Sequence, residues 1–523
     1  MKVLFCTQSE SLALFEALRA DLHERKEVER CGFVVADSAS YAKWLRANPD
    51  FEGCGHVLLK EWGVTRRPFE RPNRAALAEM ERDLGGAAGL FGAVVADRRL
   101  WMGKDCTYSQ DYTRRFTDEE LLCILQRGVT AVNRLFDELS PDLVLGFICV
   151  TMLDYVVYLV AKARNVPVLN LRPTRIGDRV TLASTLNDPS PEFVAEYARL
   201  MAGASSQWIG QAREHIARVR AGHGKYEGVI GLSNKPAVKV SAGRFVQFAQ
   251  LFAAAKSYHT YLTSEAASDN HVVDPLRAIY FAAVRNPLRA WRTRRFLAPH
   301  YVDPASLSGL RYAFYPLHTE PEISLLLYGR PFVNQIEVIR SLAMSLPADM
   351  VLLIKEHPWM VGKRSLDAYR KLLAIPRVCF VDPRTPARVI VQHAALVAVI
   401  TGSIALEAAM LGRPVITMGD CPFNVLPATM VQRCSDVRSL QMLVRQMMAS
   451  HETNEQALTN YVAAAMSTSA SVNLYSVLLQ KRNVHADRAG EYREEVRRLA
   501  DYLMNTLRQP TVVSNAVAGS AAW

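Results

Sequence analysis

Two stretches of the chain alternate short apolar runs with longer amphipathic segments. Runs of three to seven residues, such as VLFC (3–6) and DLVLGFI (142–148), have the length of buried strands. The segments between them repeat apolar residues every three or four positions, which is the period of a helix. In the first stretch the predicted strands are 3–6, 32–36, 57–59, 142–148 and 166–171, and the predicted helices are 10–25, 39–47, 74–84, 118–139 and 153–164.

The same alternation resumes after residue 310. Strands that alternate with helices form a parallel sheet covered on both faces, so each stretch predicts a doubly wound, Rossmann-type α/β domain. Here the predicted strands are 310–317, 350–355, 378–381, 396–400 and 414–418, and the predicted helices are 332–345, 365–373, 386–393, 403–411, 436–449, 454–480 and 485–508.

The chain therefore divides into five predicted parts. They are an N-terminal Rossmann-like domain (1–187), a helical insertion (188–304), a C-terminal Rossmann-like domain (305–480), a C-terminal helix (481–510) and a disordered tail of small residues (511–523).

The end of the insertion, 275–302, carries six Arg and no acid, together with Trp and Phe. Two interpretations stay open. The segment is either a solvated helical arm or a surface that faces an anionic membrane or a phosphate group.

The predicted strand 350–355 ends in an unusual set of residues, Lys355, Glu356, His357 and Pro358. Ligands of open parallel sheets bind beyond the carboxyl ends of the strands. Pro358 stops the strand and favours extended geometry at His357, and Lys and His side chains both donate hydrogen bonds to phosphate oxygens. The alternative is a solvated Lys355 and a His357 that satisfies a buried carbonyl.

A second polar turn follows the strand 396–400. Thr401, Gly402 and Ser403 place two hydroxyls and backbone N–H groups at the start of a helix, an arrangement that receives anions. Glu407, one turn later, could accept hydrogen bonds from ribose hydroxyls. The alternative is that Ser403 only caps its own helix. Two phosphate-compatible loops in one sheet nevertheless favour a shared anion site.

Three motifs, YPLHTEPEISL (315–325), IKEHP (354–358) and ITGSIALEAAMLGRPVITMG (400–419), resemble the C-terminal half of bacterial capsule polysaccharide biosynthesis proteins. That family includes β-Kdo transferases with a GT-B fold, and the His-Pro and Ser loops are also similar to CMP-binding motifs of bacterial sialyltransferases. The resemblance is good over 310–420 and weaker over 90–180. It implies a GT-B-like fold, in which the two Rossmann-type domains face a cleft.

The resemblance also implies roles for individual residues. The donor-nucleotide contacts would be Lys355, His357, Thr401, Gly402, Ser403 and Glu407, with His318 and Glu322 facing the same cleft. The family's usual motif contains glutamine where this chain has PLHTEPE with His318, so the identity of the nucleotide stays open.

The N-terminal domain offers weaker candidates. A glycosyltransferase needs a carboxylate that activates an acceptor hydroxyl or stabilises an oxocarbenium-like centre, and cations that steady phosphate groups. Asp97 and Asp154 are the candidate catalytic carboxylates; an N-cap role for Asp154 and an ion pair for Asp97 are the alternatives. The candidate acceptor or phosphate contacts are Arg98, Arg172 and Arg175.

The composition and motifs of the chain limit the binding partners and the cellular compartment that we expect. The net charge of +11 favours a polyanionic partner, but no RNP motif or zinc-finger spacing occurs, so we expect no nucleic acid. Nine scattered cysteines without a C-x-x-C pair, and an N-terminus without a signal-peptide core, predict a cytoplasmic protein, and a location at the inner face of the cytoplasmic membrane stays open. The chain contains no D-x-D, H-x-x-x-H, H-E-x-x-H, G-x-S-x-G or Walker motif, so we expect no metal and no cofactor other than a nucleotide-sugar co-substrate.

These features and the resemblance predict a metal-independent GT-B glycosyltransferase of capsule or surface glycan biosynthesis. It would transfer a sugar from a nucleotide donor, with CMP-Kdo as the first choice, to a polysaccharide or lipid-linked acceptor. The leaving group would be neutralised by His357, Lys355 and the helix dipole behind Ser403. Two alternatives remain, an isomerase similar to UDP-N-acetylglucosamine 2-epimerase and a non-catalytic subunit of a polysaccharide assembly machine.

Overall fold

The computed structural model of the 523-residue chain describes residues 1–8, 11–84, 89–101, 115–223, 258–265, 269, 272, 274–479 and 489–508. The predicted tail 511–523 lies outside the described residues.

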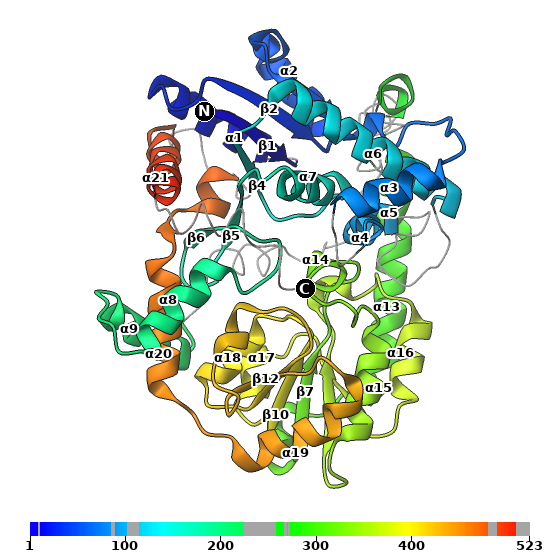
Figure 1. The fold of residues 1–523 in the computed structure, drawn as a ribbon. Coiled ribbons are helices and arrows are strands. Elements are labelled where there is room, and N and C mark those ends of the chain that lie inside the picture. Colours follow the sequence, from blue (N-terminus) through cyan, green and yellow to red (C-terminus); the bar gives the residue numbers. More distant parts are fainter. Residues whose placement is uncertain are drawn as a thin grey trace.

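The described chain forms two α/β domains, drawn one above the other in Figure 1. The N-terminal domain contains a seven-stranded sheet with the order β13-β6-β5-β4-β1-β2-β3. Its strands β3, β2, β1, β4 and β5 are parallel, whereas β6 runs antiparallel to β5 and to β13. The strand bounds are β1 Lys2–Thr7, β2 Arg30–Val35, β3 Val57–Lys60, β4 Leu143–Gly146, β5 Val168–Pro173, β6 Arg179–Ala183 and β13 Ala470–Ser471.

Helices cover both faces of this sheet because its central strands are apolar on both sides. In β4, for example, all four residues are buried. One core cluster joins β1 and β2 to α1 and α21, and another joins the opposite face to α6 and α7. The helix bounds are α1 Ser11–Glu24, α2 Ser38–Ala47, α3 Arg74–Leu84, α4 Gly92–Ala96, α5 Arg98–Trp101, α6 Asp118–Leu139, α7 Met152–Ala163 and α21 Ala489–Leu507.

The C-terminal domain contains a six-stranded parallel sheet with the order β12-β11-β10-β7-β8-β9. The predicted fold class, two Rossmann-type doubly wound domains, is therefore confirmed. The strand bounds are β7 Tyr312–Pro316, β8 Val351–Lys355, β9 Val378–Val381, β10 Leu396–Val399, β11 Val415–Thr417 and β12 Val431–Arg433. The helix bounds are α14 Ile323–Leu326, α15 Gln335–Ser345, α16 Leu366–Leu373, α17 Ala387–Val391, α18 Ile404–Met410 and α19 Leu440–Ser450.

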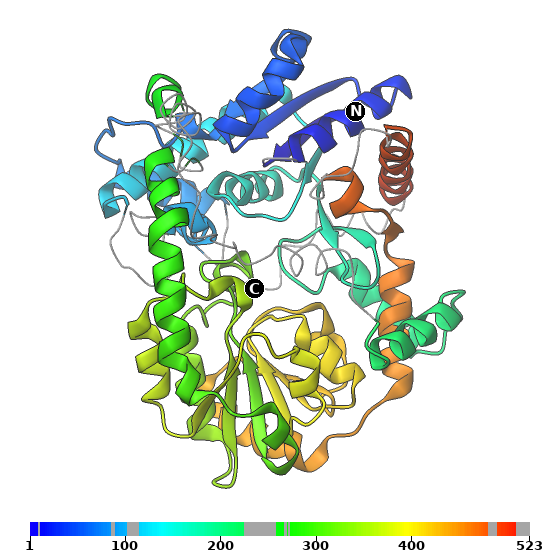
Figure 2. The same ribbon diagram turned by 180° about the vertical axis from the view of Figure 1, so that it is seen from behind.

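The segment between the two sheets is helical in its described part. Helices α8 and α9 pack against α20, so the core cluster of the C-terminal domain extends onto them. A further helical stretch, α12, the π-helical turn η4 and α13, runs lengthwise along the side of the molecule that faces the viewer in Figure 2. The bounds are α8 Pro191–Met201, α9 Ile209–Arg220, α12 Pro275–Tyr280, η4 Phe281–Arg285, α13 Asn286–Leu297 and α20 Glu455–Ser467.

The prediction of continuous helix over 454–480 is wrong. Helix α20 ends at Ser467, and Ala470–Ser471 then forms β13, which pairs with β6 of the N-terminal sheet. Small hydroxyl residues favour such an end because their side chains compete for backbone hydrogen bonds. Arg179 also donates to the carbonyls of Met466 (2.8 Å) and Ser469 (2.6 Å), which the end of the helix leaves without helical partners. The chain thus returns to the N-terminal domain.

The strand order of the C-terminal sheet reverses between β7 and β10. The chain proceeds from β7 to β8 and β9 on one side, and then to β10, β11 and β12 on the other. Such a topological switch point opens a crevice at the carboxyl ends of the two strands, which is where open α/β sheets bind ligands. The N-terminal sheet has the corresponding reversal between β1 and β4.

Candidate functional site at the switch point of the C-terminal sheet

His318 joins the two loops that flank the C-terminal switch point. It follows β7, and its Nε2 accepts a hydrogen bond from the backbone N–H of Thr401, which follows β10, at 3.2 Å. Burial, aided by the nearby positive charge of Arg175, lowers the pKa of the imidazole to about 4, so the ring is neutral at physiological pH. A neutral ring that accepts at Nε2 carries its proton on Nδ1.

The Nδ1 atom of His318 is buried and makes no hydrogen bond of ordinary geometry with the described residues, although the Gln335 side chain lies near enough to the ring to oppose the lowering of its pKa. Buried donors normally find an acceptor, and each exception calls for an explanation. An acceptor atom of a bound ligand, such as a phosphate oxygen, would satisfy this N–H group.

His357 is the second imidazole near the switch point, in the loop after β8. Its Nδ1 accepts from the backbone N–H of Trp359 at 3.3 Å, at the start of the short 3-10 helix Pro358–Met360. Burial lowers the pKa of His357, and its neutral ring therefore carries the proton on Nε2. Lys355, the last residue of β8, is half-buried, and burial also lowers its pKa. The structure thus places both predicted donors at the carboxyl end of β8.

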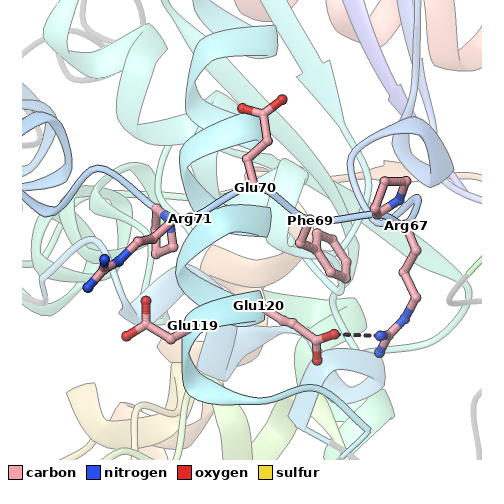
Figure 3. A pocket seen from close by; sticks show the side chains of 8 residues that line it. Arg67, Phe69, Glu70, Arg71, Glu119 and Glu120 are labelled. Atoms are coloured by element: carbon pink, nitrogen blue, oxygen red, sulfur yellow. Dashed lines mark ion pairs between the residues drawn. The ribbon is translucent and has the colours of Figure 1, made fainter.

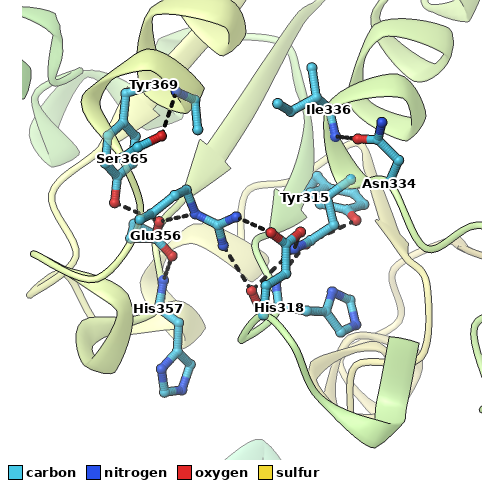
Figure 4. Close-up of polar contacts among 12 residues, drawn as sticks. Tyr315, His318, Asn334, Ile336, Glu356, His357, Ser365 and Tyr369 are labelled. Carbon is cyan, nitrogen blue, oxygen red and sulfur yellow. Dashed lines mark hydrogen bonds and ion pairs between the residues drawn. The ribbon is translucent and has the colours of Figure 1, made fainter. Parts of the chain in front are cut away.

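A buried polar network connects the loop after β7, which contains His318, to the loop after β8, which contains His357 (Figure 4). Glu356 is fully buried and accepts from Arg364 Nε (2.8 Å), from the hydroxyl of Tyr369 (2.7 Å) and from the backbone N–H of His357 (2.7 Å). Arg364 continues to Glu320 Oε2 (2.7 Å) and to the carbonyl of His318 (3.0 Å). The guanidinium thereby links the backbone of His318 to that of His357.

This network explains why β8 ends in an acid beside a cation and an imidazole. Glu356 does not face a ligand; it anchors the loop. Burial acts to lower the pKa of Arg364, but Glu320 and Glu356 outweigh it, so the guanidinium stays charged. Gln335 completes the network by accepting from the His318 N–H (2.7 Å) and donating to the His318 carbonyl (3.2 Å). Sequence reasoning missed Arg364 and Gln335, because their partners lie 8 to 46 positions away on other loops.

The Thr-Gly-Ser turn after β10 lies close to the loop that follows β7. The Thr401 hydroxyl donates to the carbonyl of Ser324 at 2.9 Å. A Cβ atom on Gly419 would lie 2.5 Å from Thr401 Cγ2 and 2.5 Å from the carbonyl oxygen of Tyr328, so only glycine fits there. The backbone of this turn is therefore held tightly in place.

The remaining predicted residues of this turn have different surroundings. Ser403 precedes α18 and makes no side-chain cap hydrogen bond, contrary to the simple capping alternative. Gly402 lies beside the His318 ring, at 3.5 Å from Nε2 to an ideal Cβ position. Glu407 lies inside α18, with its Oε1 3.9 Å from Arg388 Nη1. Their contact with a nucleotide stays a prediction.

Two arginines of the N-terminal domain lie at this site. Burial raises the pKa of Glu322, whereas the hydroxyl of Ser324, at 2.9 Å from Oε2, and the charges of Arg175 and Arg98 oppose the shift. Arg175 has a left-handed backbone (φ 64°) in the connection between β5 and β6, and its charge also acts on His318. The structure therefore brings residues that the sequence assigned to opposite domains to one place.

Arg172 makes its contacts with other residues inside the protein. It is buried, with Nη1 donating to the Asn187 carbonyl (3.2 Å) and to Asp188 Oδ1 (3.1 Å). Its guanidinium also lies over the ring of Tyr328, 5.9 Å from the centroid. These contacts hold the 185–188 loop in place, so the guanidinium of Arg172 is engaged inside the protein.

Asp97 and Asp154, the predicted catalytic carboxylates, both act as helix caps. Asp97 Oδ1 accepts from the N–H groups of Arg99 (2.7 Å) and Leu100 (3.2 Å), and its Oδ2 accepts from Met152 at the start of α7 (3.1 Å). Asp154 and Thr151 form a reciprocal capping box at the start of α7.

Asp154 lies at the N-terminal switch point but in a very small space. Gln8, after β1, donates to its Oδ2, and burial raises the pKa of the carboxyl to about 6. The cavity that Asp154 lines holds about 10 Å³, which is room for one water molecule at most. A sugar cannot enter it, so this arrangement favours the structural alternative for Asp154.

A surface hollow of about 740 Å³ lies elsewhere on the N-terminal domain, between residues 67–72 and the start of α6 (Figure 3). Two of its charged side chains pair with each other, since Arg67 Nη1 lies 2.6 Å from Glu120 Oε1. The guanidinium of Arg67 also lies over the Phe69 ring, at 5.4 Å. None of the predicted site residues lines this hollow.

Across the described ranges, no group of three or more His, Cys, Asp or Glu side chains is arranged to hold a metal ion, and metal independence stays a prediction. No helix in the described part of the chain combines the length and the apolar character needed to span a bilayer.

Two Rossmann-type domains, with cations, hydroxyls and a neutral imidazole gathered at one switch point, define an α/β protein of GT-B-like architecture. Residues 256–468 match the family described as Capsule polysaccharide biosynthesis protein. This matched segment contains the three motifs at 315–325, 354–358 and 400–419, so the resemblance predicted from the sequence is confirmed there.

Comparison with solved structures gives distant similarities. UDP-GlcNAc 2-epimerase from Methanocaldococcus jannaschii is 12% identical, with 89% of this chain and 98% of that chain covered and a TM-score of 0.26. KpsC from Thermosulfurimonas dismutans, a β-Kdo 2,7 transferase, is 13% identical, with 71% and 89% covered and a TM-score of 0.34. At these values neither similarity carries an argument about function. No curated protein matches the chain.

Proposed function

We propose that this protein is a glycosyltransferase of capsule polysaccharide biosynthesis that binds a nucleotide-activated sugar at the C-terminal switch point. The observation that carries the proposal is the position of His318. It joins the loops after β7 and β10 and presents a buried N–H group that makes no hydrogen bond of ordinary geometry with the described residues. The family match supports the polysaccharide context.

Neutral and positive donors would stabilise the phosphate as it leaves. His357 offers Nε2–H, because its Nδ1 is occupied by Trp359, and Lys355 adds a positive charge from the end of the same strand. Arg175 and Arg98 add positive charge from the N-terminal domain. Preorganised donors of this kind act on the charge that develops in the transition state.

Glu322 is the carboxylate that we propose to activate the acceptor hydroxyl. Burial raises its pKa, which brings a carboxylate closer to the range of an effective general base. It lies beside Ser324 and the two N-terminal arginines, whereas Asp97 and Asp154 are committed to capping α5 and α7. This role replaces the nucleotide contact expected from the sequence for Glu322.

The donor is proposed to be CMP-Kdo, and the acceptor an oligosaccharide or a lipid-linked glycan. Both assignments rest on the family resemblance. The first test is a thermal-shift titration with CMP, UDP, GDP and CDP, because a ligand at 100 times its Kd stabilises the fold by about 2.7 kcal/mol. We expect CMP to stabilise the wild type and to have little effect on His357→Ala. Equal shifts in both proteins would remove His357 from the site.

Turnover assays then separate the alternatives. A transferase consumes its donor rapidly only when acceptor is present, whereas a 2-epimerase converts its nucleotide sugar alone. Binding of no nucleotide would favour a non-catalytic subunit. Glu322→Gln should lower kcat by about 100-fold or more, the usual contribution of a general base, while leaving CMP binding intact. Unchanged kcat in that variant would reject Glu322 as the base.

A further inference from the structure

The helical stretch 275–297, here called the arginine-rich helix, exposes an unusual amount of apolar surface. Fourteen large apolar side chains are exposed in the described part of the chain, and six of them lie within 16 residues of this helix. They are exposed by 43 to 58%. These six are Leu276, Ile279, Tyr280, Val284, Leu288 and Trp291.

The spacing of these side chains indicates one face. Leu276, Tyr280, Val284, Leu288 and Trp291 follow one another at steps of three or four positions, which places them on neighbouring turns of a helix, and Ile279 lies next to Tyr280. The opposite face of α13 is occupied, because Thr293 and Leu297 are buried and Ala290 packs against Gly362. A Cβ atom on Gly362 would lie 2.8 Å from Ala290 Cβ. The helix is thus fixed to the protein by one side and presents its other side outward, along the side of the molecule that faces the viewer in Figure 2.

The Asp, Glu, Lys and Arg side chains of this segment include only positively charged ones. Residues 275–302 contain no Asp or Glu, and Asp274 caps α12 through its contacts with the N–H groups of Leu276 (2.8 Å) and Arg277 (3.3 Å). Six arginines lie along the same helix, and three of them are in its last turns. The six are Arg277, Arg285, Arg289, Arg292, Arg294 and Arg295.

We propose that the arginine-rich helix docks the protein on a lipid bilayer that carries anionic headgroups, lying in the plane of the interface. Apolar side chains enter the boundary of the acyl chains, Trp291 and Tyr280 are suited to the headgroup level, and the arginines bind phosphate groups. A nucleic acid would use the arginines but leave the apolar stripe exposed to water, so the combination favours a membrane. This inference does not depend on the enzymatic activity.

The test is flotation of the full chain with lipid vesicles. Vesicles of phosphatidylcholine alone are compared with vesicles that also contain phosphatidylglycerol. We expect at least tenfold stronger binding to the anionic vesicles, and weaker binding when the salt concentration rises.

Two variants test the contribution of the arginines and that of the apolar side chains separately. Neutralising Arg292, Arg294 and Arg295 to Gln should weaken binding about fivefold for each charge removed. The double variant Leu288→Ser with Trp291→Ser should weaken it by tenfold or more. The matched control is Met344→Ser with Met442→Ser, which removes two exposed apolar side chains elsewhere (68% and 62% exposed) and should leave binding unchanged.

Circular dichroism and thermal unfolding confirm that each variant is folded. The proposal is overturned if the wild type binds neither vesicle, or if the control variant loses as much binding as the Leu288–Trp291 variant. It is also overturned if the Arg variant loses binding while the Leu288–Trp291 variant keeps it, because that result describes a general polyanion site.

Discussion

The imidazole Nε2 of His318 lies 3.2 Å from the backbone nitrogen of Thr401, although the two residues are 83 positions apart in the chain. This hydrogen bond fixes the tautomer of the ring and directs its only N–H group away from Thr401. It also holds together the two loops that border the switch point of the C-terminal sheet. The candidate nucleotide site therefore depends on the contact between these two residues.

His318→Gln should separate the structural role of this ring from its binding role. A glutamine carbonyl can accept from the Thr401 N–H but places no donor at the position of Nδ1. We expect stability to change little and nucleotide affinity to fall about tenfold or more, since a hydrogen bond to a charged group contributes about 1.5–3 kcal/mol. Isothermal titration with the nucleotide identified by thermal shift measures the loss. Unchanged affinity would exclude Nδ1 from the site.

The stability of the wild type and of His318→Gln can also be compared at different pH values. The pKa of His318 is about 4 in the fold, against about 6.5 for an unperturbed histidine. Between these values the unfolded chain binds more protons than the native protein. The stability of the wild type relative to His318→Gln should therefore fall as the pH decreases from about 6.5 to about 4, by up to about 3 kcal/mol. Urea unfolding at pH 7 and pH 4.5 measures the difference, and a constant difference would contradict the buried neutral ring.

Asp154 provides a test of capping against catalysis. Asparagine retains an acceptor for the N–H groups of Val150 and Thr151, so Asp154→Asn should keep transferase activity within a fewfold of the wild type. Asp154→Ala removes the cap and should destabilise the fold by about 1–2 kcal/mol. Steady-state kinetics and urea unfolding measure the two effects.

The raised pKa of Asp154 adds a second signature. The native carboxyl binds a proton up to about pH 6, whereas the unfolded one releases it near pH 3.9. The stability of the wild type relative to Asp154→Asn should thus decrease as the pH rises from about 4 to about 6. A loss of activity of 100-fold in a well-folded Asp154→Asn protein would restore Asp154 as a catalytic candidate.

Arg364→Met should be among the most destabilising changes in the C-terminal domain. It leaves Glu320 and Glu356 buried without their cation, and breaking a buried ion pair costs about 3–5 kcal/mol. The control is Arg311→Met, which removes an exposed partner of Asp349 and should cost about 1 kcal/mol or less. Urea unfolding compares them; equal effects would mean that the network does not support the loops.

Gly419→Ala should disturb the Thr401 turn directly. The new methyl group would meet Thr401 Cγ2 and the Tyr328 carbonyl at 2.5 Å, and overpacking of this kind costs about 1–3 kcal/mol. Gly490→Ala is the control, because a Cβ atom there has no neighbour within 4 Å in the described structure. Gly419→Ala should lower both the melting temperature and the nucleotide affinity, whereas Gly490→Ala should leave both unchanged.

Most strands and helices of the two sheets could be predicted, because apolar runs and helical periodicity are local signals. The strand β6 was missed, and β12 and β13 contain only three and two residues, too few for a pattern. Their formation depends on partners such as β5 and β11, which are chosen by the tertiary fold.

The candidate site could likewise be predicted only where the signals are local. Loops after parallel strands could be expected to converge, and the structure brings His318 to Thr401, although their binding roles stay predictions. Arg364 could not be found, because its partners come from separate loops. The capping role of Asp154, which the sequence analysis gave as the alternative to catalysis, agrees with the spacing of Thr151 and Asp154, a recognised helix-start signature.

The return of the chain from α20 to β13 has a mechanical consequence. Helix α20 belongs to the core of the C-terminal domain and ends at Ser467, and Ala470, three positions later, already pairs with Val180 of the N-terminal sheet. A connection of so few residues keeps this edge of the two domains together.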